Sequence, residues 1–328
     1  MAVFTEVPPD EARRLLRRLG LGELLELRGI QGGIENTNYF ATTWQAGADG
    51  AEGRQGSYVL TLFERLTAEQ LPFYLELMRH LAARGIPVPA PAPDVRGRLL
   101  HSVCDKPAAV VDRLRGRSEL APGAAHCAAI GAMLARMHLA GRDFDGRQPN
   151  LRGLDWWNET APVVMPHLDA PQAALLRSEL AYQNHVAASA EYAALPRGPV
   201  HADLFRDNAM FEGETLTGIF DFYFAGIDSW LFDLAVCLND WAIVHATGRH
   251  EPGRADALLA AYATVRPLEA AERALLPAML RAAALRFWIS RLWDFHLPRA
   301  ASMLVPHDPA HFERVLRDRA ESCLAVPA

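Results

Sequence analysis

The sequence predicts an α+β fold in two lobes, a small β-rich lobe followed by a large, mainly helical one. Two observations predict it. Apolar and polar residues alternate in short runs through the first third of the chain, as they do in the strands of an antiparallel sheet. From about Arg115 onward, long Ala- and Leu-rich stretches repeat apolar residues at helical spacing. We therefore expect the lobes to span residues 1–114 and 115–328.

The first lobe is expected to hold a sheet and two helices. A short helix in "PPDEARRLLRRLG" ends at Gly20, and "LLELRGIQGGIENTNYFATTW" then alternates around a glycine-rich bend, which predicts a hairpin. The stretch "SYVLTLFER" is typical of a third strand, and a helix in "AEQLPFYLELMRHLAARG" stops at Gly85. Two more strands, in "RGRLLHSV" and "KPAAVVDRL", complete a small antiparallel sheet with one helix inserted after its third strand.

The second lobe is expected to be helical apart from one region. Helical spacing predicts helices at residues 121–141, 171–195, 229–246, 255–265, 268–295 and 309–321. The exception is residues 198–224, where short β-like pieces are joined by turns. This region includes "VHADLFRDNAMF", which places one His, two Asp and one Asn within twelve residues.

Composition excludes several classes of protein. The net charge of −6 and the pI near 6.1 argue against a non-specific nucleic-acid binder, so a small-molecule partner is expected instead. The four cysteines lie far apart without a C-x-x-C pair, which fits reduced thiols better than a zinc site or a disulfide scaffold. The N-terminal residues do not resemble a signal peptide, and no apolar run approaches the roughly 20 residues that cross a bilayer. We expect a cytoplasmic protein that does not contact a membrane.

The pattern His201-x-Asp203-x-x-x-x-Asn208, followed by Asp221, carries the residue types that phosphoryl transfer needs. That reaction needs a carboxylate to orient and deprotonate the attacking hydroxyl, and oxygen ligands to hold Mg²⁺ against the nucleotide phosphates. Asp203 is a candidate for the first role, and Asn208 and Asp221 are candidates for the second. A solvated loop is the alternative for the stretch as a whole. His201 is a catalytic candidate whose alternative is a structural histidine that orients the loop by hydrogen bonding.

The stretch "VHADLFRDNAMF…GIFDFYFAGIDSWLFDLA" resembles the active-site signature of the aminoglycoside phosphotransferase family. With "GGIENTNYF", "KPAAVVDRLRGRS" and "RFWISRLWDF", nearly the whole chain resembles the bacterial homoserine kinase branch of that superfamily. The resemblance implies a bilobal protein-kinase-like fold of the aminoglycoside phosphotransferase type, with a nucleotide-covering first lobe. It also implies ATP and Mg²⁺ as cofactors, and an enzyme that phosphorylates the hydroxyl of L-homoserine in threonine biosynthesis.

The resemblance assigns roles to single residues. It implies that Asp203 is the base, that Asn208 and Asp221 hold Mg²⁺, and that Asp233 is a structural acid bracing the catalytic loop. The nucleotide would be bound by adenine contacts near the inter-lobe hinge and by a phosphate-covering bend, through Val111, Asp112 and Leu114 and through Gly32, Gly33, Asn36 and Asn38.

One departure from the family pattern concerns the third strand. Thr61 stands where kinases place a Lys that touches the phosphates. Lys106 and Arg65 are the candidate substitutes, and Lys106 is our choice for the nucleotide site.

Substrate contacts are expected mainly from the last long helix. Arg286 or Arg291 would receive the homoserine carboxylate, because a guanidinium binds a carboxylate through two parallel hydrogen bonds, and Trp293 lies on the same helical face as Arg286. An aromatic stripe facing the core, with arginines reaching to solvent, is the alternative. The substrate ammonium needs an acid, and the remaining candidates for the substrate pocket are Glu35, Asp240 and Tyr223. Asp207 has no assigned role and is expected to be a turn or surface residue.

Three other functions remain open. The same chemistry could act on an aminoglycoside, choline or a sugar amine, which would need an acidic or aromatic pocket without the arginine that homoserine requires. A non-catalytic nucleotide-binding pseudokinase is conceivable because the strand Lys is missing. A metal-dependent hydrolase using His201, Asp203 and Asp221 would act without ATP.

Overall fold

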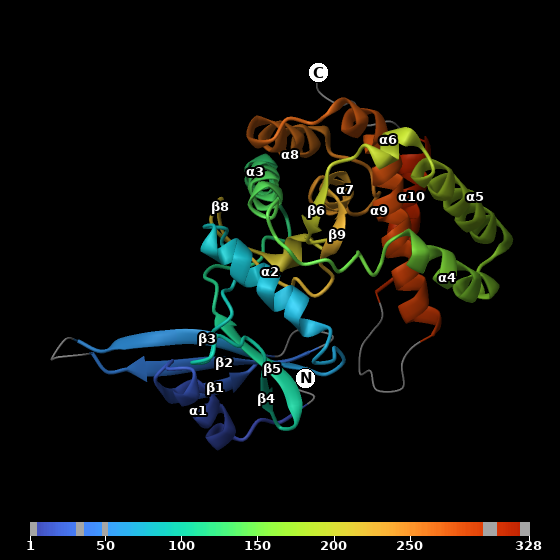
Figure 1. The fold of residues 1–328 in the computed structure, drawn as a ribbon. Helices are drawn as coiled ribbons and strands as arrows, with labels where there is room; N and C mark the ends of the chain where they lie inside the picture. Colours follow the sequence, from blue (N-terminus) through green and yellow to red (C-terminus); the bar gives the residue numbers. More distant parts are fainter. Residues whose placement is uncertain (1–4, 31–35, 48–51, 298–306, 322–328) are drawn as a thin grey trace. The chain divides into compact units, whose positions relative to one another are not determined.

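The computed structural model describes residues 5–30, 36–47, 52–297 and 307–321. The chain divides into two compact units, Met1–Arg115 and Gly116–Ala328. The first contains a small antiparallel sheet and the second is mainly helical (Figure 1), so the expected α+β fold is confirmed.

The N-terminal unit is a five-stranded sheet with the strand order β1-β2-β3-β5-β4, in which every neighbouring pair is antiparallel. Side chains alternate between its two faces, and on β2 the buried positions are every second residue from Thr37 to Thr43. Leu15 and Leu16 of the first helix pack on one face of the sheet. The elements are α1 (Pro9–Arg18), β1 (Glu23–Gly29), β2 (Asn36–Gln45), β3 (Arg54–Phe63), α2 (Leu71–Ala83), β4 (His101–Val103) and β5 (Lys106–Asp112).

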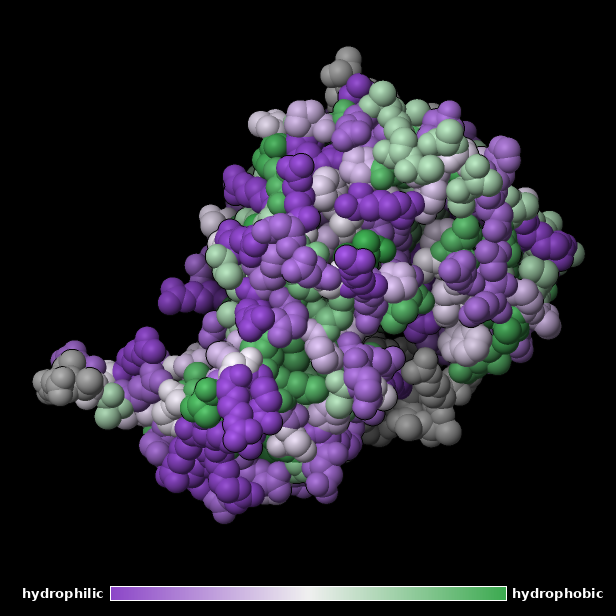
Figure 2. Space-filling view, in the orientation of Figure 1, coloured by the Kyte–Doolittle hydropathy of each residue, from purple (hydrophilic) through white to green (hydrophobic). Residues whose placement is uncertain are grey.

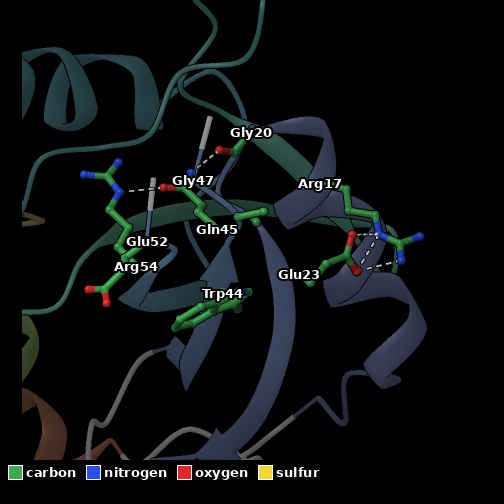
Figure 3. A pocket seen from close by; sticks show the side chains of 10 residues that line it. Arg17, Gly20, Glu23, Trp44, Gln45, Gly47, Glu52 and Arg54 are labelled. Atoms are coloured by element: carbon green, nitrogen blue, oxygen red, sulfur yellow. Dashed lines mark hydrogen bonds and ion pairs between the residues drawn. The ribbon is translucent and has the colours of Figure 1, made fainter. Parts of the chain in front are cut away.

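Polar contacts fix the end of α1 against the sheet (Figure 3). The helix stops where Gly20 adopts a φ of +68°, a conformation that glycine reaches at little cost. The carbonyl of Gly20 accepts a hydrogen bond from the side chain of Gln45, and Arg17 pairs with Glu23 at 2.6 Å. These residues line the pocket that Figure 3 shows, where Arg54 also donates a hydrogen bond to the side chain of Gln45.

The C-terminal unit is built around the helix α7, in which every residue from Trp230 to Trp241 is buried. The long helix α9 packs against α7, α4 and α10, and α3 packs along α8 (Figure 1). Two small antiparallel sheets pair β6 with β9 and β7 with β8. The helices are α3 (Ala124–Ala140), α4 (Leu154–Val164), α5 (Ala170–Ala187), α6 (Ala190–Ala193), α7 (Trp230–Trp241), α8 (Pro252–Val265), α9 (Ala270–His296) and α10 (Ala310–Glu321), with 3-10 turns η2 (Met165–His167) and η3 (Arg206–Asn208). The strands are β6 (Arg197–Val200), β7 (Ala209–Glu212), β8 (Thr215–Ile219) and β9 (Gly226–Ser229).

Some element boundaries differ from those predicted. The single helix expected at 171–195 is divided into α5 and α6, because the side chain of Ser189 accepts a hydrogen bond from the backbone of Tyr192 and starts a new helix. The strand expected in "RGRLLHSV" is only the three-residue β4, and α4 and β9 were not predicted.

Hydrophilic residues cover much of the face seen in Figure 2, and hydrophobic residues appear there in separate groups. Among the described residues, no helix has both the length and the apolar character that crossing a bilayer requires.

Candidate active site

The loop that carries the predicted catalytic residues is held at its start by Asp233, in the first turn of α7. The two carboxylate oxygens of Asp233 accept hydrogen bonds from the backbone N–H groups of His201 and Ala202, both at 2.8 Å. Ala202 has a φ of +62°, a left-handed conformation that is unfavourable for residues other than glycine. Asp233 therefore holds in place a turn that the local sequence would not favour, and these contacts are those expected of a bracing acid.

Asp233 has a second partner behind the loop. The Nε2 of His138, on α3, lies 3.1 Å from the Asp233 carboxylate, and the Nδ1 of His138 lies 2.8 Å from the hydroxyl of Tyr262. All three side chains are buried. Burial lowers the pKa of His138. Burial would raise the pKa of Asp233, but the hydrogen bonds from His138 and from the loop keep that pKa below its usual value. The group thus contains a neutral imidazole that donates to an ionised carboxylate.

His201 ties the loop to the next strand. Its side chain is fully buried, and its Nε2 lies 2.9 Å from the carbonyl oxygen of Phe220, to which it donates a hydrogen bond. Burial lowers the pKa of His201, so the imidazole is neutral at pH 7. Phe220 directly precedes Asp221, so His201 fixes the backbone next to a predicted metal ligand. This contact fits the orienting alternative for His201.

The structure brings Asp203, Asn208 and Asp221 together. The side-chain amide of Asn208 donates to the carbonyl of Asp203 at 2.8 Å and to its carboxylate at 3.2 Å. The backbone N–H of Phe220 donates to the carbonyl of Asn208 at 3.0 Å, which places Asp221 beside the loop. Asp221, like Ala202, has a left-handed backbone, with a φ of +65°.

The environment of Asp203 shifts its acidity. Burial raises the pKa of Asp203 to about 7, the positive charge of Arg286 opposes this rise, and the negative charge of Asp221 adds to it. A guanidinium nitrogen of Arg286, on α9, lies 3.9 Å from the Asp203 carboxylate. Arg286 is itself buried, burial lowers its pKa to about 10, and its Nε and Nη2 have no hydrogen-bond partner among the described residues. The arrangement gives a carboxylate that can take up a proton near neutral pH.

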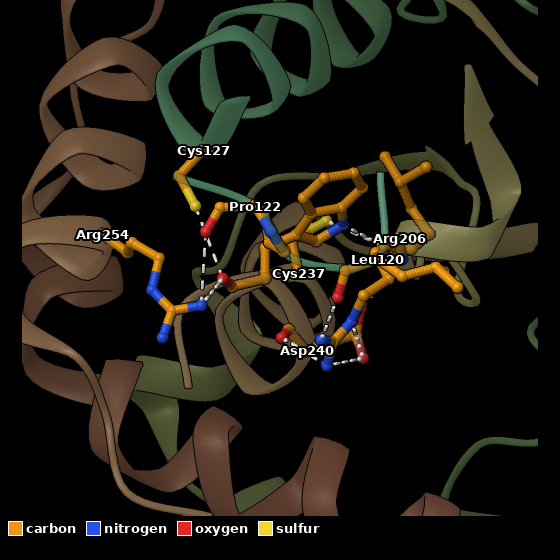
Figure 4. Close-up of polar contacts among 9 residues, drawn as sticks. Leu120, Pro122, Cys127, Arg206, Cys237, Asp240 and Arg254 are labelled. Carbon is orange, nitrogen blue, oxygen red and sulfur yellow. Dashed lines mark hydrogen bonds and ion pairs between the residues drawn. The ribbon is translucent and has the colours of Figure 1, made fainter. Parts of the chain in front are cut away.

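The other substrate candidates of the C-terminal unit lie on α9, on α7 and after β8. Arg291 and Asp240 line one pocket beside the loop, and Asp240 is bound there by Arg206 (Figure 4). The backbone N–H of Arg206 donates to the Asp240 carboxylate at 2.8 Å, and its guanidinium contacts the same carboxylate at 3.1 Å. Tyr223 and Trp293 are half-buried, and burial raises the pKa of Tyr223.

The nucleotide candidates that the structure describes lie on β2 and β5. Thr61 of β3 stands opposite Asn38 of β2, and its hydroxyl donates to the Asn38 side chain at 2.7 Å. Lys106 begins β5, where its ammonium group pairs with the carboxylate of Glu64 and lies 2.6 Å from the Thr5 hydroxyl. At the position where kinases place a Lys, this protein therefore has Thr61, which is hydrogen-bonded to Asn38.

The remaining nucleotide candidates are placed by the strand ends. Asn36 is the first residue of β2, Val111 and Asp112 end β5, and Leu114 follows two residues later. Gly32, Gly33 and Glu35 lie outside the described residues.

Two residues that support the loop, His138 and Arg206, were not predicted from the sequence. His138 is a lone histidine near the end of an apolar helix, and Arg206 lies two residues before Asn208. For His138, the sequence shows only a polar residue within an apolar helical pattern. Such a pattern does not predict which residue, 95 positions away, is its partner.

Comparison with known proteins identifies the family of this chain. Residues 26–275 match the model of the Phosphotransferase enzyme family. The chain is 64% identical to a homoserine kinase of Polaromonas naphthalenivorans, covering 97% of this chain and 98% of that protein. It is 57% identical to a homoserine kinase of Paraburkholderia xenovorans, covering 100% of this chain and 98% of that protein.

A solved structure extends the comparison to the fold. An amicoumacin kinase in complex with AMP-PNP, Ca²⁺ and Ami superposes with a TM-score of 0.65 at 17% identity, covering 95% of this chain and 94% of that one. The expected kinase-like fold is confirmed, as is the expectation of an ATP-dependent phosphotransferase that acts on a hydroxyl group. The chain belongs to the phosphotransferase enzyme family.

Proposed function

We propose that the protein transfers the γ-phosphoryl group of ATP to the hydroxyl of L-homoserine and releases O-phospho-L-homoserine. The observation that carries the proposal is the held loop, in which Asp203 and Asn208 are hydrogen-bonded to each other and Asp221 lies beside them. The choice of homoserine is supported by curated homoserine kinases that are 55–64% identical along nearly the whole chain.

Asp203 is the proposed base. It would accept the proton of the substrate hydroxyl as that oxygen attacks the γ-phosphorus. Burial has raised its pKa to about 7, which lies near the pH at which a base is most effective. Positioning of the substrates and stabilisation of charge would account for most of the rate enhancement, because phosphoryl transfer requires little covalent chemistry by the protein.

Asn208 and Asp221 are the proposed Mg²⁺ ligands. An amide oxygen and a carboxylate are hard oxygen donors of the kind that Mg²⁺ prefers, and Mg²⁺ usually completes its shell with water and substrate phosphates. Among the described residues, no group of three or more His, Cys, Asp or Glu side chains is arranged for a metal ion, so water and the phosphates would have to supply the other ligands. The negative charge of Asp221 that raises the pKa of Asp203 would also be offset by a cation. When bound, Mg²⁺ neutralises the charge of the phosphates.

The remaining sequence predictions stand as part of this proposal. Residues 1–114 would bind the nucleotide, with Asn36, Asn38 and Lys106 toward its phosphates and Val111, Asp112 and Leu114 toward its adenine. Residues 115–328 would carry the catalytic loop and the substrate site.

An ADP-release assay with ATP and Mg²⁺ tests the proposal. Homoserine, serine, choline and kanamycin would be compared as acceptors, and homoserine should give the highest kcat/KM. Asp203→Ala should abolish transfer and leave ATP binding largely intact, whereas Asp221→Ala should lose Mg²⁺-dependent ATP binding. Asp256→Ala, at an exposed position on α8, is the matched control and should behave as wild type.

Three results would count against the proposal. Wild-type turnover by Asp203→Ala would remove Asp203 as the base, and unchanged ATP affinity in Asp221→Ala would remove Asp221 as a ligand. Preference for choline or kanamycin would replace homoserine as the acceptor.

A further inference from the structure

A pocket of about 640 Å³ opens in the C-terminal unit directly after the proposed base. Its volume lies within the range of small-molecule sites. Phe205, Arg206 and Asp207, which follow Asp203 in the chain, form one wall. The other lining residues come from α7, α9, α10 and the segments beside them, and they are Leu120, Asp240, His245, Ala246, Arg291, His307, Asp308, His311, Phe312 and Arg314.

The charges in this lining are balanced, with three arginines and three aspartates. Burial lowers the pKa of His307, and it lowers that of His311 to about 4, so both are neutral at pH 7. A polycation such as an aminoglycoside would need an excess of acidic groups, which this pocket does not offer. Balanced charge instead suits a ligand that carries one positive and one negative group.

Within the described ranges, Arg291 and Asp207 are available to meet such a ligand. Arg206 and Asp240 already bind each other through five nitrogen–oxygen contacts of 2.8–3.3 Å, four of them to the Asp240 carboxylate. Within the described ranges, the guanidinium of Arg291 has no hydrogen bond or ion pair. The carboxylate of Asp207 is exposed, and within the same ranges its one hydrogen bond comes from its own backbone N–H. In this part of the chain, an arginine and an aspartate that are not paired with other side chains therefore line one pocket.

The aromatic residues of the pocket are committed to packing. Phe205 and Phe312 stack on each other with ring centroids 5.9 Å apart, and Phe287 packs against both, at 4.4 Å and 5.0 Å. Both lining rings are buried. They form an apolar floor, and they do not form the open aromatic cage that a quaternary ammonium such as choline needs.

We propose that this pocket binds the amino-acid end of the acceptor, with Arg291 receiving the α-carboxylate and Asp207 receiving the α-ammonium group. The inference rests on the proposed function and deepens it. A guanidinium matches a carboxylate through two parallel hydrogen bonds, and an aspartate is a suitable partner for an ammonium group. The charge of Arg291 acts on both Asp203 and Asp207, so the pocket and the base are close neighbours.

Asp207 gains a role that its sequence context did not suggest. It was expected to be a turn or surface residue, and it is indeed exposed. Its exposure, however, is toward a pocket that begins next to the base. A specificity-determining residue between Asp203 and Asn208 would place the ammonium of the substrate at a fixed distance from the loop that activates its hydroxyl.

The test compares acceptors that lack one charged group. 3-Aminopropan-1-ol is homoserine without its carboxylate, and 4-hydroxybutyrate is homoserine without its ammonium group. ADP release gives kcat and KM for all three acceptors with wild type, Arg291→Gln and Asp207→Asn. Arg136→Gln and Asp256→Asn, at exposed positions on α3 and α8 outside the pocket, are the matched controls.

We expect Arg291→Gln to raise the KM for homoserine about 10- to 100-fold, the usual effect of losing a charge-assisted hydrogen bond, with the KM for ATP unchanged. The same variant should leave kcat/KM for 3-aminopropan-1-ol unchanged, because that acceptor has no carboxylate to lose. Asp207→Asn should weaken homoserine similarly and leave 4-hydroxybutyrate unchanged. Arg291→Lys, which keeps the charge and loses the two-point geometry, should give an intermediate KM.

The outcomes separate this inference from the proposed function. If wild type releases no ADP with homoserine, the proposed function fails. If wild type phosphorylates homoserine but both variants keep its KM, the pocket assignment alone is overturned. An equal loss with all three acceptors would also overturn it, because the substitution would then be acting on the loop and not on one end of the substrate.

Discussion

Replacing Asp233 by Ala removes the carboxylate on which the catalytic loop is built. The side chain is fully buried and accepts hydrogen bonds from two backbone N–H groups at 2.8 Å and from His138 at 3.1 Å. Each buried donor left without a partner costs about 1–3 kcal/mol, and the three donors here are two backbone N–H groups and the neutral imidazole of His138. Because the three donors meet at one carboxylate, their losses overlap. We expect the free energy of unfolding to fall by about 3–5 kcal/mol, which is less than three independent losses would add up to.

Urea unfolding followed by tryptophan fluorescence measures this change in the right part of the chain. Six of the seven tryptophans lie in the unit that contains Asp233, and Trp230 and Trp241 are on the same helix. Asp256→Ala, at an exposed position, should change stability by less than about 0.5 kcal/mol. Asp233→Asn keeps the shape and one acceptor oxygen, so its loss should be smaller than that of the Ala variant.

The same variants separate stability from function. Under conditions where Asp233→Ala is still folded, kcat should fall, because Ala202 loses the contact that holds its left-handed backbone. A loss of stability below about 1 kcal/mol in Asp233→Ala would refute the reasoning, since it would mean that water or other groups replace the carboxylate without cost.

Two further predictions concern the same unit. A Cβ added to Gly131 of α3 would lie 2.1 Å from the carbonyl oxygen of Leu258 on α8, so Gly131→Ala should force the helices apart and cost about 1–3 kcal/mol in urea unfolding. In Gly253→Ala the new Cβ meets nothing closer than 3.5 Å, so this control should be neutral or stabilising by up to about 1 kcal/mol, and equal losses in both would contradict the packing argument. Burial lowers the pKa of His138 and of His201 from 6.5, so below that pH only the unfolded chain takes up these protons. Each histidine should therefore lower stability by about 1.4 kcal/mol per pH unit below pH 6.5, whereas Asp203, whose pKa burial raises to about 7, should add about as much per unit below pH 7. Urea unfolding of Asp203→Asn removes the second effect, and a flat profile of this variant between pH 7.5 and 5.5 would be inconsistent with neutral buried imidazoles.

The fold was largely predictable because its signals are local. Alternation along β2 and β3 and the helical spacing of α7 and α9 are visible within a dozen residues, and the glycines that end α1 and α2 are in the sequence. The strand β9 was missed for the opposite reason. Its four residues include a Gly and an Asp, and they are a strand only because they pair with β6, about 30 residues earlier.

The candidate catalytic and metal-binding residues could be predicted from the sequence, but the residues that hold them in place could not. The order of Asp203, Asn208 and Asp221 follows from the chemistry, and the structure brings them together. The contact of His138 with Asp233 joins residues 95 positions apart, so no local pattern could pair them. Arg206 was likewise not predicted to have a role. Because it binds the carboxylate of Asp240, that carboxylate already has a partner, whereas the sequence had suggested it as a ligand for the substrate.

Two residues with a left-handed backbone explain why polar side chains are buried around the loop. Ala202 and Asp221 both have positive φ, and such conformations cost roughly 1–3 kcal/mol each unless neighbouring groups hold them. Asp233 holds the first through the N–H of Ala202, and His201 holds the second through the carbonyl of Phe220. Both groups contact backbone atoms of the loop and of Phe220, and in these hydrogen bonds neither uses the Asp203 carboxylate. The buried acid and histidine thus stabilise the shape of the loop, while the proposed chemistry is left to side chains that they position.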